Sequence, residues 1–120
     1  MSQPILVVDD DPGLRQMMQW ALEDEGYRVE AAADAEQAVA HMRDAVPRLV
    51  VLDMTLPGRD GTAVAEALRA LDPKVPIVLV TGDGNAQSKA ERVGARAFLR
   101  KPFRMDDLVA NVRGAIATPP

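Results

Sequence analysis

A chain of 120 residues, of which 48% are apolar and 27% charged, has the size and composition of one folded domain. Its 18 acidic and 14 basic residues give a net charge of −4, and the basic residues are scattered singly, which argues against a nucleic-acid surface and favours a bound cation. The absence of cysteine excludes a disulfide frame, a thiolate nucleophile and a thiolate metal site. No apolar run is long enough for a membrane helix or a signal peptide, so we expect a cytoplasmic protein that does not bind membranes.

Apolar segments of strand length alternate along the chain with segments of helical spacing. Strands are predicted at 5–8, 27–32, 49–52, 77–80 and 95–100, and helices at 12–24, 35–45, 62–72, 85–94 and 105–117. The segments 5–8, 49–52 and 77–80 are apolar throughout, which is typical of strands buried on both faces. Strict alternation of strand and helix predicts a parallel sheet with helices on both of its faces.

Residues at the predicted helix ends support these boundaries. Asp11, followed by Pro12 and Gly13, is suited to cap the helix at 12–24, and Gly26 stands where that helix should end. Asp34 is the expected N-cap of the following helix.

Polar side chains stand where four of the predicted strands end. They are Asp9, Asp10 and Asp11 after the first strand, Asp53 after the third, Thr81 after the fourth and Lys101 after the fifth. Each residue alone is more simply explained as a helix cap or as a solvated strand end. Because parallel strands finish at one edge of the sheet, however, these side chains are expected to converge on a single site.

The residue types at this edge indicate phosphoryl chemistry. Carboxylates brought close together repel one another unless a hard cation such as Mg²⁺ joins them. The Lys101 ammonium and the Thr81 hydroxyl are suited to bind phosphoryl oxygens, and the Asp53 carboxylate can act as a nucleophile that forms an acyl phosphate.

Four sequence stretches, ILVVDDDP, LVVLDMTLPGRDG, PIVLVTG and AFLRKPF, together resemble the receiver domain of bacterial two-component response regulators. The resemblance extends over about residues 4 to 117. It implies a flavodoxin-like, doubly wound α/β fold with a five-stranded parallel sheet in the order 2-1-3-4-5, five helices and a cis peptide between Lys101 and Pro102. The receiver domain is expected to span 1–117, with 118–120 as a tail or the start of a linker.

The resemblance also implies a role for each site residue. The implied cation, Mg²⁺ or Mn²⁺, is bound by Asp9, Asp10, Asp53 and the backbone carbonyl of Thr55, while Asp53 accepts the phosphoryl group and Thr81 and Lys101 bind it. The phosphoryl donor would be a sensor histidine kinase or a histidine phosphotransfer protein. The domain would then be a signalling switch and no enzyme, apart from catalysing its own aspartyl phosphorylation and dephosphorylation. It would act on a downstream protein or output domain through the face of the fourth helix, fifth strand and fifth helix.

Two aromatic residues have alternative interpretations. Phe98 matches the position of the switch aromatic of receivers, which would turn inward together with Thr81, but it could equally be a core or edge residue that does not move. Trp20 lies off the apolar stripe of its helix, and is either partly buried packing or an anchor that docks a partner.

Two other protein classes use related chemistry. A haloacid-dehalogenase-like, magnesium-dependent phosphohydrolase also uses a strand-end aspartate, but it requires a second aspartate two residues later, where this chain has Thr55. A flavodoxin-type electron carrier requires a hydroxyl-rich phosphate loop after the first strand, whereas DDDPG would repel a flavin phosphate.

Overall fold

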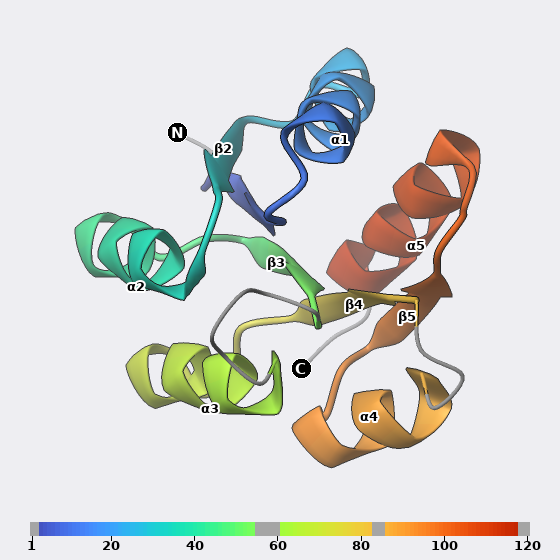
Figure 1. Cartoon of the computed structure of the whole chain (residues 1–120). Helices are drawn as coiled ribbons and strands as arrows, with labels where there is room; N and C mark the ends of the chain where they lie inside the picture. Colours follow the sequence, from blue (N-terminus) through green and yellow to red (C-terminus); the bar gives the residue numbers. More distant parts are fainter. Residues whose placement is uncertain (1–2, 55–60, 83–85, 118–120) are drawn as a thin grey trace.

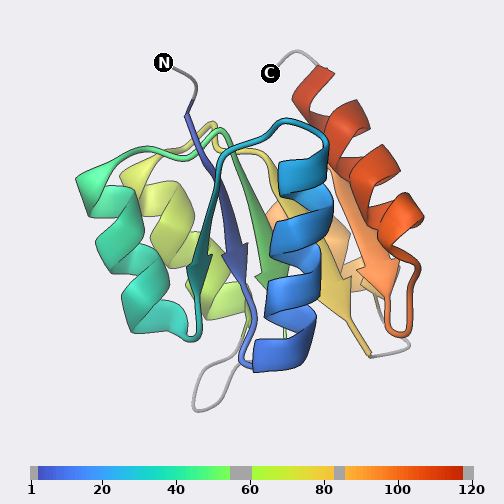
Figure 2. The same cartoon turned by 90° about the horizontal axis from the view of Figure 1, so that it is seen from above.

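The computed structural model describes residues 3–54, 61–82 and 86–117, and its centre is a parallel sheet. The sheet consists of β1 (Ile5–Val8), β2 (Val29–Ala32), β3 (Leu49–Asp53), β4 (Ile77–Thr81) and β5 (Ala97–Arg100). The strands lie in the order β2-β1-β3-β4-β5 and every neighbouring pair is parallel, so the predicted fold class and strand order are confirmed. Figure 2 shows that all the strands point to the same edge of the sheet.

Helices cover both faces of this sheet. They are α1 (Pro12–Asp24), α2 (Ala35–Asp44), α3 (Gly61–Leu71), α4 (Ala86–Val93) and α5 (Met105–Ala117). Helices α1 and α5 lie on one face, and α2, α3 and α4 lie on the other (Figures 1 and 2). Every predicted helix is present, with ends within one residue of the predicted ones. No helix in the described part of the chain is long and apolar enough to cross a membrane.

Each face of the sheet has its own apolar core. In β1, Ile5 and Val7 pack toward α1 and α5, whereas Leu6 and Val8 pack toward α2, α3 and α4. All residues of β1, β3 and β4 are buried, as predicted from their uninterrupted apolar sequences. A strand covered on both sides needs apolar side chains at successive positions, because these alternate between the two faces.

The predicted caps form as expected. The Asp11 carboxylate accepts hydrogen bonds from the backbone N–H groups of Gly13 and Leu14 at 2.9 and 3.3 Å, and Asp34 accepts one from Gln37 at 2.8 Å. Gly26, just beyond α1, has a φ of 93°, a conformation that glycine adopts without strain. The Asp11 cap therefore fixes the start of α1 only a few residues after the end of β1.

Arg69, near the end of α3, connects two other parts of the structure. Its Nε donates to the carbonyl of Val93 at 2.9 Å and its Nη2 to the carbonyl of Gly94 at 2.8 Å, both at the end of α4. Its Nη1 donates to the carbonyls of Pro73 and Val75, each at 3.2 Å, in the connection to β4. One guanidinium thus ties the carboxyl-terminal end of α4 to α3.

Candidate functional site

The predicted site residues lie at the edge where the strands end. Asp53 and Thr81 are the last residues of β3 and β4, so both belong to the sheet and not to the loops that follow. Among residues 3–54, 61–82 and 86–117, the buried polar or charged residues are Asp9, Asp53 and Thr81, each with 0% exposure. Burying polar groups is costly unless they gain partners, and all three are gathered at this one edge.

Three carboxylates meet at this edge. Asp9, Asp10 and Asp53 each place one carboxylate oxygen within 4.8 Å of the other two, and Asp10 is the exposed member of the cluster. Oδ1 of Asp9 accepts a hydrogen bond from the Asp11 backbone N–H at 2.9 Å, whereas the buried Oδ2 of Asp9 has no hydrogen-bond partner in the described part of the chain. An unsatisfied buried carboxylate oxygen beside two other carboxylates fits a divalent cation that prefers oxygen ligands.

Lys101 supplies positive charge to the same cluster. Its Nζ lies 3.2 Å from Oδ2 of Asp53 and 3.7 Å from Oδ2 of Asp9. Its backbone N–H donates to the carbonyl of Thr81 at 2.8 Å, and the peptide that follows, Lys101–Pro102, is cis as predicted. Burial alone would lower the pKa of Lys101, but the hydrogen bond to Asp53 and the charges of Asp53 and Asp9 outweigh it and raise the pKa above its ordinary value.

The surroundings of Asp9 raise the pKa of its carboxyl toward neutral pH. Burial raises the pKa of this carboxyl from 3.8 to about 6, and the nearby charges of Asp53 and Asp10 act in the same direction. The hydrogen bond from the Asp11 N–H and the charge of Lys101 oppose the rise without cancelling it. A cation at the cluster would favour the ionised carboxylate that burial disfavours.

Thr81 and Phe98 lie on the same face of the sheet. Phe98 is half-buried and packs against the core on the side of α2, α3 and α4, and its register partner in β4 is Leu79, two residues before Thr81. Alternate residues of a strand share a face, so Thr81 and Phe98 are diagonal neighbours on adjacent strands. Thr55, the expected backbone ligand, and the predicted tail at 118–120 lie outside the described residues.

Trp20 is a surface residue with 62% of its area exposed, so it lies outside both apolar cores. Met17, one helical turn earlier on α1, is 51% exposed. Beside Met17, a groove of about 570 Å³ runs between the start of α1 and the segment after β5. It is lined by Asp11, Gly13, Leu14, Met17, Lys101, Pro102, Phe103 and Met105. An apolar surface therefore adjoins the acidic cluster.

Arg15 is a neighbour of the site that did not stand out in the sequence. Its Nη1 donates a hydrogen bond to the backbone carbonyl of Asp9 at 2.7 Å. The sequence indicates only that Arg15 is four residues after the Asp11 cap, and therefore one helical turn further along α1 and close to the site. Because its acceptor is a backbone oxygen, no pattern of side chains indicated this contact.

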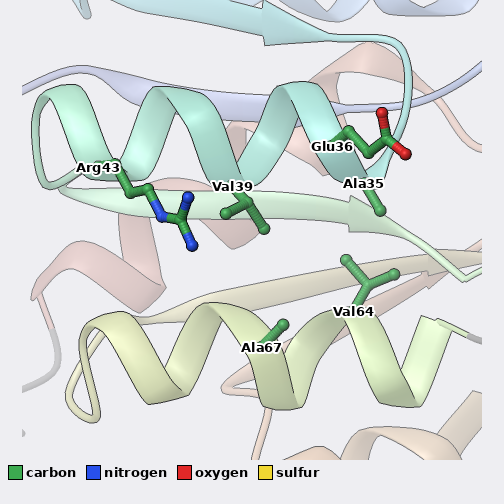
Figure 3. Close-up of a pocket in the computed structure, with 6 residues that line it drawn as sticks. All are labelled: Ala35, Glu36, Val39, Arg43, Val64 and Ala67. Atoms are coloured by element: carbon green, nitrogen blue, oxygen red, sulfur yellow. The ribbon is translucent and has the colours of Figure 1, made fainter.

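A smaller groove of about 230 Å³ lies between α2 and α3. Figure 3 shows Val39 and Ala35 facing Val64 and Ala67 across it, with the Arg43 side chain reaching along one end. None of the predicted site residues lines this groove, and the candidate cation cluster found in the described residues is at the strand edge. The chemistry therefore belongs to the strand edge.

Comparison with known proteins identifies the family. The sequence model of the response regulator receiver domain matches residues 5–113. The chain is 36% identical to the nitrogen assimilation regulatory protein NtrX of Azorhizobium caulinodans, over 98% of this chain and 27% of that protein. It is 41% identical to the DNA-binding response regulator MtrA of Mycolicibacterium smegmatis, over 97% of this chain and 51% of that protein. The chain thus spans a quarter to a half of these relatives.

Solved structures agree with this assignment. The receiver domain of NtrX from Brucella abortus superimposes with a TM-score of 0.89 at 39% identity, covering 96% of this chain and 99% of that one. The chemotaxis protein CheY4 of Vibrio cholerae gives a TM-score of 0.87 at 29% identity, with 96% and 99% covered. With four strand-end motifs at one edge of the expected sheet, the chain belongs to the response regulator receiver domain family of two-component systems.

Proposed function

We propose that this domain is a phosphorylation-dependent switch that accepts a phosphoryl group on Asp53 from a sensor histidine kinase or a histidine phosphotransfer protein. The observation that carries the proposal is the pairing of the buried Asp53 with the half-buried Lys101 at 3.2 Å, beside Oδ2 of Asp9, which has no hydrogen-bond partner in the described part of the chain. This arrangement holds a nucleophilic carboxylate next to one fixed cation and a place for a second. Both positive charges would face the oxygens of an incoming phosphoryl group.

Asp9, Asp10 and Asp53 would hold the second cation, Mg²⁺ or Mn²⁺, together with the proposed backbone carbonyl of Thr55. When bound, this cation offsets the charge of the carboxylates and of the phosphoryl oxygens. The exposed Asp10 is proposed as the principal carboxylate ligand, with Asp9 acting partly through a water molecule. Asp11 is already engaged as the cap of α1 and has no part in this set.

The transfer makes one bond and breaks one bond. A carboxylate oxygen of Asp53 attacks phosphorus, the P–N bond to the donor imidazole breaks, and the leaving nitrogen keeps the bonding pair and takes up a proton. The Lys101 ammonium then moves its pairing from Asp53 to a phosphoryl oxygen, and the Thr81 hydroxyl donates a hydrogen bond to another. The reaction is confined to the domain's own aspartate, so the proposed role is signalling and not the turnover of a separate substrate.

The phosphoryl donor is proposed to dock on α1. Trp20 and Met17 are exposed on this helix, and the groove beside Met17 leads to Lys101. Tryptophan is enriched at binding hot spots, and an exposed one on the same helix as this groove supports α1 as the docking surface. The downstream partner or output domain is proposed to bind the face formed by α4, β5 and α5, where Phe98 follows the movement of Thr81.

The first experiment is incubation with acetyl phosphate and Mg²⁺, followed by intact-mass measurement and mapping of the modified residue. We expect one phosphoryl group on Asp53, no modification when the divalent cation is removed, and none in Asp53→Asn. Phosphorylation of Asp53→Asn at the parent rate would contradict the assignment. Sustained release of inorganic phosphate from added phosphate esters would instead favour the phosphohydrolase alternative.

A Mg²⁺ titration tests the proposed ligands. Asp10→Asn should weaken Mg²⁺ binding more than Asp11→Asn, because Asp11 is occupied by the helix cap. The two substitutions change the net charge equally, so Asp11→Asn is the matched control. Equal weakening would mean that the three aspartates form only a diffuse acidic patch.

A further inference from the structure

Residues 9–11 are held in place by two sets of hydrogen bonds. The Asp11 carboxylate is bonded to the first turn of α1, and the Asp11 N–H is bonded to the Asp9 carboxylate at 2.9 Å. On the other side, the half-buried Arg15 donates from Nη1 to the Asp9 carbonyl at 2.7 Å. That carbonyl belongs to the peptide group that joins Asp9 to Asp10.

Fixing this carbonyl fixes the direction of the Asp10 side chain. The peptide is planar, so the position of its oxygen determines the orientation of the whole unit, including the nitrogen of Asp10. If the peptide turned, the Asp10 side chain would leave the backbone in another direction. Asp10 is the exposed member of the cluster, so burial constrains it less than it constrains Asp9 and Asp53.

We propose that Arg15 is a positioning residue of the cation site, holding the Asp9–Asp10 peptide so that the Asp10 carboxylate faces Asp9 and Asp53. Arg15 is not a ligand, because a guanidinium has no lone pair to offer a metal. This inference depends on the proposed cation binding. It assigns to Arg15 the role that hydrogen-bond partners of metal ligands have in other proteins, where their loss weakens metal binding.

The charge of Arg15 and its proposed positioning role predict opposite effects on Mg²⁺ affinity when the side chain is removed. A guanidinium beside an acidic cluster repels an incoming cation, so removing its charge alone would strengthen Mg²⁺ binding. Removing a group that orients a ligand would weaken Mg²⁺ binding. The sign of the change therefore distinguishes the two roles.

The test is calorimetric titration of Mg²⁺ into the parent, Arg15→Met and Arg15→Lys at fixed ionic strength. Arg43→Met is the matched control, because Arg43 is exposed on α2 beside a different groove and its loss changes the net charge equally. We expect Arg15→Met to raise the Kd for Mg²⁺ about tenfold, the lower end of the range for outer ligand partners. Arg43→Met should leave the Kd unchanged or slightly lower. In the metal-free protein, the amide resonances of Asp10 and Asp11 should shift in Arg15→Met and should not shift in Arg43→Met.

Unchanged or tighter Mg²⁺ binding by a folded Arg15→Met would overturn the positioning role. If Arg15→Met does not fold, Arg15→Lys decides: it keeps the charge but is one bond shorter, so weaker binding supports positioning and parent-like binding contradicts it. A parent protein that binds no Mg²⁺ would instead contradict the cation site itself, which is a separate failure of the proposed function.

Discussion

Lys101 and Asp53 are 48 positions apart in the chain, yet Nζ of Lys101 lies 3.2 Å from Oδ2 of Asp53. The same nitrogen is 3.7 Å from Oδ2 of Asp9, so one ammonium offsets two carboxylates that are fully buried. Parallel strands β1, β3 and β5 bring these three side chains to one edge of the sheet. The unphosphorylated domain thus already uses the group that is proposed to bind the phosphoryl oxygens.

Replacing Lys101 by Met should destabilise the metal-free domain. The two buried carboxylates lose their cation, and we expect the free energy of unfolding to fall by about 1–3 kcal/mol. Adding Mg²⁺ should recover most of this loss. Urea denaturation with and without Mg²⁺ measures both effects, and the exposed Lys74→Met is the control, expected within about 0.5 kcal/mol of the parent. Equal stability of Lys101→Met and the parent without Mg²⁺ would show that the pair contributes nothing.

Asp9 should make the metal-free domain less stable as the pH rises from 4 to 6. The pKa of Asp9 is about 6 in the folded state, against an ordinary value of 3.8, so the folded state holds the proton more tightly. The proton on Asp9 therefore adds about 1–3 kcal/mol to the free energy of unfolding. This stabilisation is fully present below pH 4 and is lost as the pH rises through 6. Denaturation of the parent and Asp9→Asn across this range isolates the effect.

Protonation of Asp9 should also make the affinity for Mg²⁺ depend on pH. The cation competes with the Asp9 proton, so the affinity for Mg²⁺ should fall when the pH is lowered from 7 to 5. In Asp9→Asn the remaining affinity should change less over that interval. If stability and Mg²⁺ affinity change with pH in the same way in the parent and in Asp9→Asn, then protonation of Asp9 does not cause either pH dependence.

Gly61 and Gly114 should respond oppositely to alanine. A Cβ on Gly61 would come within 2.7 Å of the Cα and 2.8 Å of the carbonyl oxygen of Met54, which follows Asp53 directly. We expect Gly61→Ala to lower the free energy of unfolding by about 1–3 kcal/mol and to disturb the end of β3 at Asp53. In α5, a Cβ on Gly114 meets nothing within 4 Å, so Gly114→Ala should stabilise the domain by about 0.5–1 kcal/mol. Chemical denaturation of both variants checks the contrast, which a gain in stability for Gly61→Ala would refute.

Much of the fold was predictable, because it depends on patterns that follow the chain. The apolar strands, the caps at Asp11 and Asp34 and the convergence of strand ends all follow from local sequence and parallel topology. Three features required coordinates. The carbonyl contact of Arg15 and the close approach of Gly61 involve backbone atoms, which have no sequence signature. The exposure of Trp20 depends on how α1 is rotated against the sheet.

Trp20→Ala should slow phosphoryl transfer from the cognate histidine kinase without slowing transfer from acetyl phosphate. The side chain is 62% exposed on α1, so its loss should leave the stability within about 0.5 kcal/mol of the parent. Phosphorylation rates with the two donors give the comparison. Leu71→Ala, which removes another exposed apolar side chain at the end of α3, is the control. Equal slowing with both donors would indicate a structural role for Trp20.

Thr81→Ala should separate phosphorylation from its output. Asp53 should still be modified, but the hydroxyl that we expect to move toward the phosphoryl group is missing, so Phe98 should keep its unphosphorylated position. NMR spectra with and without beryllofluoride and Mg²⁺ test this. In the parent we expect shifts at Phe98 and across α4, β5 and α5, and in Thr81→Ala only around Asp53. Parent shifts confined to the pocket would contradict the switch and leave Phe98 as a residue that does not move.

The guanidinium of Arg69 limits how α4 can respond to such a signal. Its bonds to Val93 and Gly94 fix one end of the helix, and the buried α4 residues Ala90 and Val93 are both in that half. Gln87 and Ser88, nearer the end that follows Thr81, are exposed. While the Arg69 bonds remain, we expect α4 to pivot about its held end at Gly94. A small displacement beside Thr81 should then tilt the helix and not translate it.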